Sequence, residues 1–396
     1  MNEKTSILST VSIYHAFNDG AISVIPLMFP IFKTIFNLSY TQVGIITGGG
    51  LLISIIAQLI IGRLSDGKNC RTMLSTGVLL ISFSMYLLTR SIGFLTIVMF
   101  MFMLRFSASF FHPIGTGWIS RIFKKDRLDW AMGVQSGFAD VGAFIAVSTT
   151  LLVSELINWE FTLYIWSISG SIILLIGIFL TRNIDEKYLI VEKTKQKQTI
   201  KESLSEVLVF LKNIKILIPA MIISGATWGV TITYMPLLLA ERTSLSLSYI
   251  GLIVSIWIGV GSLTCFLYGR ITSKIGRKNV ILFSYLTVGV MGVLLVFFSN
   301  IYIILGIMLL LGVSTFLTYP AIASFISEIT HESAEGKTFG TVFTFQLGGG
   351  TIFLFFGGVF SDMFGIWTPF AMLGMFSLFI AGLIVVNIKK PIVKPI

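Results

Sequence analysis

The chain has 396 residues, of which 55% are hydrophobic and 12% are charged. Soluble globular proteins carry about 25% charged residues, so this composition excludes a soluble enzyme, a disordered chain and a disulfide scaffold. The net charge of +10 could indicate a nucleic-acid partner. The basic residues gather instead in short segments between long apolar runs, which predicts an all-α, polytopic membrane protein with no nucleic-acid partner.

Apolar runs long enough to cross a bilayer core as helices follow one another along the chain. They predict twelve spans, at residues 8–32, 43–64, 72–90, 93–121, 129–154, 160–182, 214–240, 247–270, 279–299, 301–327, 337–361 and 366–388. With a cytoplasmic N-terminus, 24 of the 28 Lys and Arg residues lie on the cytoplasmic side, three lie opposite, and Arg105 is inside a span. The positive-inside rule therefore predicts cytoplasmic N- and C-termini in a plasma (inner) membrane.

A polar stretch at 183–213 divides the spans six and six. The predicted domains are an N-terminal six-helix bundle at 1–182, a cytoplasmic linker at 183–213 and a C-terminal six-helix bundle at 214–396. Apolar residues at helical spacing in 199–212 indicate that part of the linker is an amphipathic helix on the membrane surface.

The two halves repeat each other at an offset of 207 residues. The matched pairs are Gly62 with Gly269, Pro113 with Pro320, Gly133 with Gly340 and Gly142 with Gly349. Because each half has an even number of spans, both insert the same way up. This arrangement resembles the parallel repeat of major facilitator transporters, whose two six-helix bundles give alternating access to a central site.

The loops after the second and eighth spans resemble the signature of that superfamily, in which a glycine, an acid and a basic turn follow one another. A glycine permits a tight turn, and an acid can pair with basic side chains or a helix N-terminus. Such a contact could hold one conformation closed, although any short cytoplasmic loop tends to be basic. The predicted latch residues are Gly62, Asp66, Arg71, Gly269, Gly276 and Arg277.

Three ionisable residues lie inside spans of the first half: Asp19, Arg105 and Asp140. Each costs about 2.5–3.5 kcal/mol to insert at mid-bilayer, so they are expected to face a water-filled cavity or one another. His15 shares a helix face with Asp19, and His112 lies in the span of Arg105. One interpretation is proton coupling by the carboxylates and histidines, with Arg105 binding an anionic substrate group. The alternative is a structural ion pair that joins the first, fourth and fifth spans. Under both interpretations Arg105 is expected to pair with Asp19 or Asp140.

Further candidate substrate-binding residues are Asn18, Trp228, Tyr234 and Tyr319, although the three aromatic residues could equally be packing or interfacial residues. Prolines are expected to kink the first, fourth, seventh and tenth spans, at Pro26, Pro30, Pro113, Pro236 and Pro320. Cys70 and Cys265 lie in different halves without metal-ligand spacing. No metal or other cofactor is expected.

The first span reads Tyr-His-Ala-Phe-Asn-Asp up to Asp19, and the fourth contains Ser-Phe-Phe-His-Pro around His112. With Lys-Ile-Gly-Arg-Lys around Gly276, these runs resemble the fosmidomycin-resistance branch of the major facilitator superfamily. The resemblance covers nearly the whole chain. It implies efflux of a drug or metabolite driven by inward proton flow, with Asp19 and His112 at the motif positions.

The expected function is therefore secondary active transport by a monomer whose partners are a small-molecule substrate, protons and the lipid bilayer. Proton-coupled efflux by antiport is the main prediction, and proton-coupled uptake of a small anion by symport is the alternative. The competing class is a non-transporting membrane protein, such as an assembly factor or a membrane enzyme. The spans contain no nucleophile–base pair or metal spacing, and the chain has no phosphate-binding loop for ATP, so it is not expected to be an enzyme.

Overall fold

The structure is a computed structural model that describes residues 2–65, 67–123, 125–190, 217–329 and 335–387. Regular structure within these ranges is helical, apart from one isolated bridge between Asn69 and Ile190. The predicted latch residue Asp66 and the predicted amphipathic helix at 199–212 lie outside the described residues.

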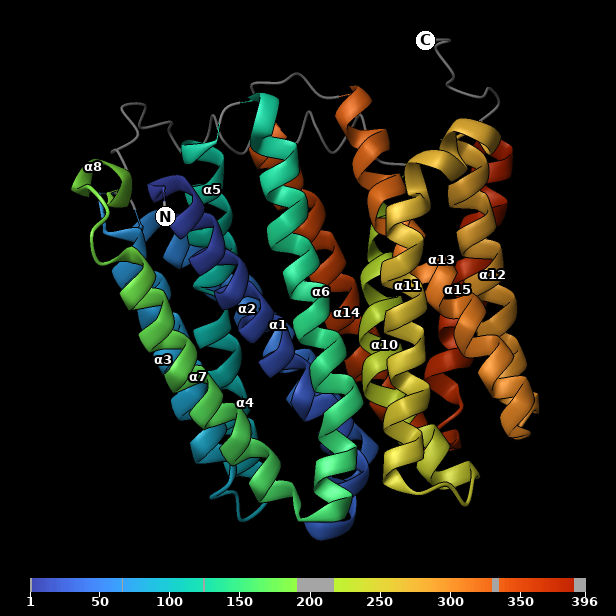
Figure 1. Ribbon diagram of the computed structural model, residues 1–396. Helices are drawn as coiled ribbons and strands as arrows, with labels where there is room; N and C mark the ends of the chain where they lie inside the picture. Colours follow the sequence, from blue (N-terminus) through green and yellow to red (C-terminus); the bar gives the residue numbers. More distant parts are fainter. Residues whose placement is uncertain (1, 66, 124, 191–216, 330–334, 388–396) are drawn as a thin grey trace. The chain divides into compact units, whose positions relative to one another are not determined.

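Every predicted span corresponds to a helical segment with nearly the same bounds (Figure 1). The first six are α1 (Glu3–Ile35), α2 (Tyr40–Leu64), α3 (Cys70–Leu88), α4 (Phe94–Ala108) continued by η1 (His112–Thr116) and α5 (Gly117–Ile122), α6 (Lys125–Leu156) and α7 (Trp159–Thr181), followed by the short α8 (Glu186–Leu189). The last six are α10 (Ile218–Arg242), α11 (Leu247–Ile275), α12 (Arg277–Phe297), α13 (Ile301–Ile329), α14 (Glu335–Phe364) and α15 (Thr368–Asn387).

Within the described ranges, eleven helical segments are long and apolar enough to cross a membrane. Helix α1 is 33 residues long but is not among them, because its buried side includes polar residues that lower its mean hydropathy. These are Ser6, Thr10, Ser12, His15, Asn18 and Ser23. The predicted number of twelve spans therefore stays a prediction, and the difference concerns the helix that carries Asp19.

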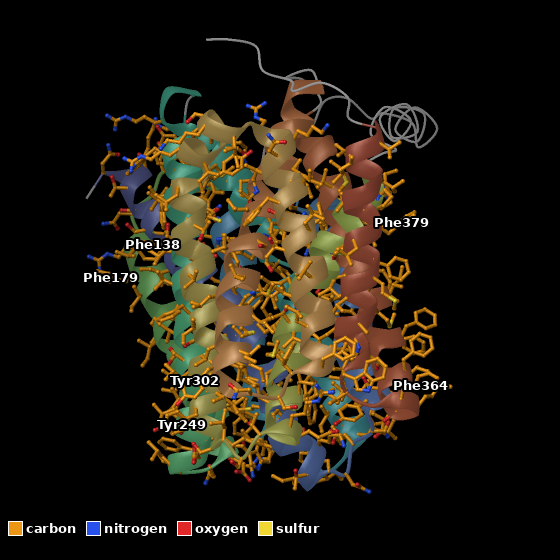
Figure 2. All side chains as sticks on the ribbon, turned by 90° about the vertical axis from the view of Figure 1, so that its right-hand side faces the viewer. Phe138, Phe179, Tyr249, Tyr302, Phe364 and Phe379 are labelled. Carbon is orange, nitrogen blue, oxygen red and sulfur yellow. The ribbon has the colours of Figure 1, made fainter. Side chains whose placement is uncertain are left out.

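Large apolar side chains point outward from the helices, as expected where lipid is the solvent (Figure 2). Phe138, Phe179, Phe364 and Phe379 are 44–61% exposed. The buried polar side chains are mostly those of serine and threonine. The chain is therefore a multi-pass membrane protein that presents its apolar surface to the bilayer.

The chain divides into two compact units. The first consists of residues 1–38, 49–196 and 246–252, and the second of residues 39–48, 197–245 and 253–396. Each unit thus includes the first residues of one helix, α2 or α11, whose remainder belongs to the other unit. The predicted bundle boundaries at 182 and 214 stay a prediction.

The internal repeat recurs as two equivalent helix contacts, one in each unit. A Cβ atom on Gly142 of α6 would lie 1.9 Å from the carbonyl oxygen of Ala16 on α1, and one on Gly349 of α14 would lie 2.1 Å from that of Ile222 on α10. Only glycine permits such close backbone approach. Gly142 and Gly349 are one of the pairs predicted from the offset of 207 residues.

A second equivalent pair of contacts caps two helix N-termini. The Asp362 carboxylate accepts hydrogen bonds from the backbone N–H groups of Tyr40 (2.8 Å) and Thr41 (2.7 Å) at the start of α2. The Glu155 carboxylate accepts one from the backbone N–H of Ser248 (2.6 Å) at the start of α11. Both acids satisfy N–H groups that have no partner within their helix. Glu155 and Asp362 are related by the same offset of 207 residues.

The expected proline kinks are realised most clearly at Pro113. The α-helix of the fourth span ends at Ala108, and a π-helical turn, η1, contains Pro113. The other four prolines lie inside continuous helices: Pro26 and Pro30 in α1, Pro236 in α10 and Pro320 in α13. The irregular turn at Pro113 positions the side chain of the neighbouring His112.

Candidate functional site

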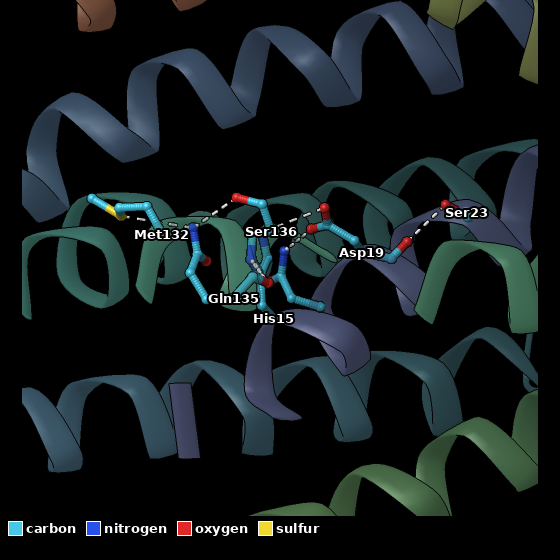
Figure 3. A network of polar contacts seen from close by, with 7 residues as sticks. His15, Asp19, Ser23, Met132, Gln135 and Ser136 are labelled. Carbon is cyan, nitrogen blue, oxygen red and sulfur yellow. Dashed lines mark hydrogen bonds and ion pairs between the residues drawn. The ribbon is translucent and has the colours of Figure 1, made fainter. Parts of the chain in front are cut away.

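A polar network in the first unit joins the middle of α1 to α6 (Figure 3). His15 and Asp19 lie one turn apart on α1, and the His15 Nε2 atom is 3.5 Å from the Asp19 Oδ2 atom. The His15 side chain is 7% exposed and that of Asp19 is 27% exposed. The backbone carbonyl of Gln135 on α6 accepts a hydrogen bond from His15 Nδ1 (3.0 Å). The Gln135 side-chain amide donates to the Ser136 hydroxyl (3.0 Å).

These contacts determine which ring nitrogen of His15 carries a hydrogen. A carbonyl oxygen only accepts, so the bond to Gln135 places the hydrogen on Nδ1. In a neutral ring, Nε2 then presents its lone pair to the Asp19 carboxylate, and two acceptors face each other at 3.5 Å. The buried Nε2 atom has no hydrogen-bond partner among the described residues. One added proton, on Nε2 or on Asp19, would make this contact attractive.

The irregular turn of the fourth span brings a second histidine to the pair. The Phe111 ring stacks on His15 at a centroid distance of 4.0 Å, and the His112 ring meets His15 edge-on at 5.5 Å. Ligand atoms of His15, Asp19 and His112 lie within 4.8 Å of one another. A metal ion could share atoms of these types at this spacing. The sequence predicts no metal, and this stays a prediction.

Two further predicted residues join this cluster at longer range. Arg105 on α4 and Asp140 on α6 each interact electrostatically with Asp19. Gly50 makes room for the arginine, because a Cβ atom there would lie 3.0 Å from Arg105 Cγ. In the part of the chain that the structure describes, Arg105 forms no ion pair within 4 Å, and its buried Nε atom has no hydrogen-bond partner. The direct ion pair predicted for Arg105 is therefore replaced by a looser charged cluster.

Asn18 is buried, at 3% exposed, and contacts the cluster directly. Its side-chain Nδ2 donates a hydrogen bond of 2.9 Å to Asp19 Oδ1. Asn18 therefore orients the carboxylate, a role that sequence reasoning missed when it placed this residue among the substrate contacts. The adjacent positions of the two residues were the signal that could have indicated it.

The second unit contains the predicted aromatic residues. Trp228 on α10 is half-buried and packs against Trp257 and Phe316, with ring centroids 4.9 and 5.4 Å away. Tyr319 on α13 is half-buried, and the hydroxyl of the adjacent Thr318 lies 3.0 Å from the Ser224 hydroxyl of α10. Both residues therefore lie where α10 approaches a neighbouring helix, with part of their surface accessible.

Tyr234 has a different environment. It is fully buried, and its hydroxyl donates a hydrogen bond of 2.5 Å to the backbone carbonyl of Leu354 on α14. This geometry makes Tyr234 a link between α10 and α14 and leaves none of its surface for a ligand. Its predicted part in substrate binding is not carried further.

The predicted latch residues that the structure describes lie near the ends of helices and in the turns between them, and their predicted role as a latch stays a prediction. Gly62 lies in the last turn of α2, and the left-handed conformation occurs at Gly67 (φ +73°). In the second loop Gly276 is left-handed (φ +78°) and precedes α12, whose first residue is Arg277. Gly269 lies within α11, where a Cβ atom would meet nothing within 4 Å.

Arg71 contacts the end of a neighbouring helix. Its guanidinium donates a hydrogen bond of 3.0 Å to the carbonyl of Thr181, the last residue of α7. The following segment is held by Trp118, whose indole donates to the Tyr188 carbonyl (2.7 Å). In this segment the Lys187 Nζ atom lies 2.7 Å from the Asp185 Oδ2 atom. The hydrogen bond from Lys187 lowers the pKa of the Asp185 carboxyl below its usual value. Arg71 therefore stabilises the last turn of α7, directly before this segment.

Two residues of the site were missed by sequence reasoning. Gln135 determines the tautomer of His15 through a backbone carbonyl, which any residue type supplies, so no sequence pattern could have indicated it. Phe111 stacks on His15, and its position directly before His112 in the Phe-Phe-His-Pro run was the available signal. Both depend on the packing of α1 against α6 and the fourth span.

Known proteins resemble this chain in sequence over part of its length. It is 31% identical over 110 residues to the uncharacterized MFS-type transporter YfnC of Bacillus subtilis, which covers 28% of this chain and 27% of that protein. It is 28% identical over 177 residues to the multi-drug resistance efflux pump PmrA of Streptococcus pneumoniae, covering 44% of each. The alignments thus span less than half the length of these relatives.

Solved structures show the same fold over almost the whole chain. A mutant of the nucleoside transporter NupG matches with a TM-score of 0.81 and 13% identity, covering 98% of this chain and 100% of that one. A bacterial homolog of the human lysosomal transporter Spinster matches with a TM-score of 0.75 and 14% identity, covering 98% and 95%. At these identities the likeness concerns the fold alone.

The family model of the Major Facilitator Superfamily matches residues 11–346 and, in a second alignment, 217–395. The first match alone covers most of the chain, including every residue of the charged cluster. Members of this superfamily are membrane transporters for small-molecule substrates. This chain belongs to the Major Facilitator Superfamily.

Proposed function

We propose that this transporter couples proton entry to the export of a drug or small metabolite, and that the proton binds between His15 and Asp19. The observation that carries the proposal is the pair of facing acceptor atoms, His15 Nε2 and Asp19 Oδ2, 3.5 Å apart. The hydrogen bond to the Gln135 carbonyl keeps Nε2 turned toward the carboxylate. The pair is therefore built to gain and lose one proton.

The charges of the cluster support the same stoichiometry. With neutral imidazoles, Asp19 and Asp140 contribute two negative charges and Arg105 one positive charge. An uncompensated charge within the membrane costs about 2.5–3.5 kcal/mol. One bound proton makes the cluster neutral, which favours its uptake when the site is closed to water. We propose coupling to a single proton on this basis.

Competition for Arg105 would link the proton to the substrate. Its Nε atom is buried without a hydrogen-bond partner among the described residues, and a guanidinium can bind an anionic or polar group in a bidentate manner. An anionic group that binds Arg105 would raise the proton affinity of the carboxylates, as symport requires, whereas a cationic group drawn to the carboxylates would lower it, as antiport requires. In either case the proton and the substrate affect each other reciprocally.

The similarity to the efflux pump PmrA over 177 residues supports export rather than uptake. The proposal includes Trp228 and Tyr319 as contacts for the apolar part of the substrate, since both are half-buried. It also includes a plasma-membrane location with cytoplasmic termini, a monomer, and movement limited by the loops around Gly62 and Gly276. His112 would modulate the His15–Asp19 pair from its edge.

The proposal is tested in inverted membrane vesicles with an acidified lumen and a pH-sensitive dye. Fosmidomycin, other phosphonates and small cationic drugs are added one at a time. Antiport predicts release of lumenal protons on addition of a substrate, and vesicles without the transporter serve as the control. If no compound released lumenal protons although one of them entered the vesicles, export by antiport would be contradicted.

Uptake of a small anion by proton symport is the second candidate. The specific observation in its favour is the buried Arg105 Nε atom, which could hold a carboxylate or phosphonate. Right-side-out vesicles with an inward proton gradient distinguish the two functions. Symport predicts accumulation of an anion in them, whereas antiport predicts none.

Arg105→Lys is expected to weaken substrate binding by about tenfold or more, because lysine retains the charge but lacks the planar fork. Hydrogen bonds to charged groups are worth about 1.5–3 kcal/mol, which corresponds to this range. The concentration for half-maximal proton release by an active compound measures the effect. Arg90→Lys, on an exposed arginine just beyond the end of α3, is the matched control. A wild-type value in Arg105→Lys would remove Arg105 from the substrate site.

Chelation provides a separate test of the proton assignment. His15, Asp19 and His112 could also share a metal ion, and a transporter that required one would lose activity in EDTA. We expect proton release to be unchanged after dialysis against EDTA and on addition of zinc at micromolar concentration. Loss of activity that zinc restores would assign the cluster to a metal ion instead.

A further inference from the structure

A cavity of about 300 Å³ lies at the N-terminal end of α1, away from the charged cluster. It is lined by Asn2, Lys4, Thr5, Leu8, Phe123, Arg127 and Trp130. Two of these side chains are cationic, and none is acidic. The lining comes from α1, from the end of the fourth span and from the first turns of α6. All of it belongs to the first unit.

We infer that this cavity binds the phosphate headgroup of an anionic phospholipid. Lys4 and Arg127 supply the positive charge, and the cavity lies where the long helices α1 and α6 begin. Helix N-termini add partial positive charge and N–H donors to the side-chain cations. Basic pockets between transmembrane helices are suited to anionic headgroups.

The remaining lining favours a lipid over a free phosphate ion. Leu8, Phe123 and Trp130 give the cavity an apolar side, and the Phe123 and Trp130 rings pack edge-to-face with centroids 6.4 Å apart. The Trp130 indole is 58% exposed, as is typical of tryptophan at a membrane–water interface. A free phosphate ion has no apolar part that could pack against these side chains. The glycerol and first acyl carbons of a phospholipid do.

The acidic side chains that the structure describes near the cavity are either engaged elsewhere or outside its lining. The Glu3 carboxylate accepts a hydrogen bond of 3.0 Å from the backbone N–H of Asp185. Asp185 is itself paired with Lys187. Asp129 of α6 is exposed and does not line the cavity. The positive charge of Lys4 and Arg127 is therefore available to a ligand.

The predicted orientation places this end of α1 on the cytoplasmic side, facing the leaflet whose anionic lipids attract basic residues. The inference does not depend on the transported substrate or on proton coupling. It assigns Lys4, Arg127 and Trp130 to lipid binding. None of these three residues belongs to the proposed transport site.

The test is native mass spectrometry of the purified full-length protein titrated with phosphatidylglycerol or phosphatidylcholine. Wild-type protein is expected to retain one phosphatidylglycerol molecule in preference to phosphatidylcholine. Lys4→Gln/Arg127→Gln should weaken its retention roughly 30-fold, since each basic residue contributes about a factor of five. Lys68→Gln/Lys274→Gln removes two exposed charges elsewhere and should bind as the wild type does.

Further measurements distinguish lipid binding in the cavity from attraction to general surface charge and from binding of free phosphate. Thr5→Trp fills the cavity without changing its charge and should also weaken retention. Equal retention by wild type and Lys4→Gln/Arg127→Gln, or full retention by Thr5→Trp, would overturn the inference. Displacement of the lipid by millimolar inorganic phosphate would assign the site to a free anion and also overturn it. Thermal melting in detergent verifies that each variant is folded.

Discussion

Asp19→Asn is expected to reduce substrate-dependent proton release to the level of vesicles without the transporter. Asparagine keeps the shape of the side chain but cannot ionise. Without the charge of Asp19, the charges of Asp140 and Arg105 cancel, and the cluster is neutral before any proton binds. The amide would donate to His15 Nε2, so the facing acceptors that require a proton disappear. The acidified-vesicle assay described above measures the effect.

The matched control is Asp129→Asn, which removes an exposed carboxylate of α6 outside the cluster. We expect this variant to release protons as the wild type does. Both variants should be present in the membrane at the wild-type amount, as judged by immunoblot. If Asp19→Asn still released protons at the wild-type rate, Asp19 would be a structural residue and another group would carry the proton.

Gly142→Val is expected to prevent α1 and α6 from packing at their closest point. Even the Cβ atom would lie 1.9 Å from the Ala16 carbonyl oxygen, and the conflict is with backbone rather than a movable side chain. Overpacking typically costs about 1–3 kcal/mol, and here the shift would also separate His15 from the Gln135 carbonyl. We therefore expect a lower melting temperature in detergent and loss of transport.

Gly133→Val on the same helix is the control, because a Cβ atom there would meet nothing within 4 Å. Its melting temperature should stay close to that of the wild type. Gly349→Val should behave as Gly142→Val does, since it occupies the equivalent position against Ile222. A wild-type melting temperature for Gly142→Val would mean that the two helices do not approach so closely.

Most helix positions could be predicted because hydrophobic length is a local property of the chain. Helix α7, for example, was expected at 160–182 and spans Trp159–Thr181. Helix α1 differs from the other spans because its polar residues lower its mean hydropathy. It is nevertheless helical, since it packs against α6. The pairing of Gly142 with Gly349 was also visible, because a repeated fold repeats its tightest contacts.

The sequence predicted which residues form the site but not how they are arranged. Asp19, Arg105 and Asp140 were found because charges within spans are costly and therefore rare. Their arrangement was not predictable: Arg105 forms no ion pair within 4 Å among the described residues, and Asn18 donates a hydrogen bond to Asp19. Tyr234 shows the converse, since an aromatic residue in a candidate cavity helix proved to be buried.

The sequence by itself determined the fold class, the superfamily resemblance and the set of ionisable residues that enter the membrane. These follow from composition, spacing and the cost of burying charge, each of which is readable along the chain. Only the tertiary structure decided that His15 Nε2 faces Asp19 with its hydrogen on the other nitrogen, because the Gln135 carbonyl that determines this lies 120 residues away on another helix. Which atoms meet across two packed helices depends on their register, and no local pattern encodes it.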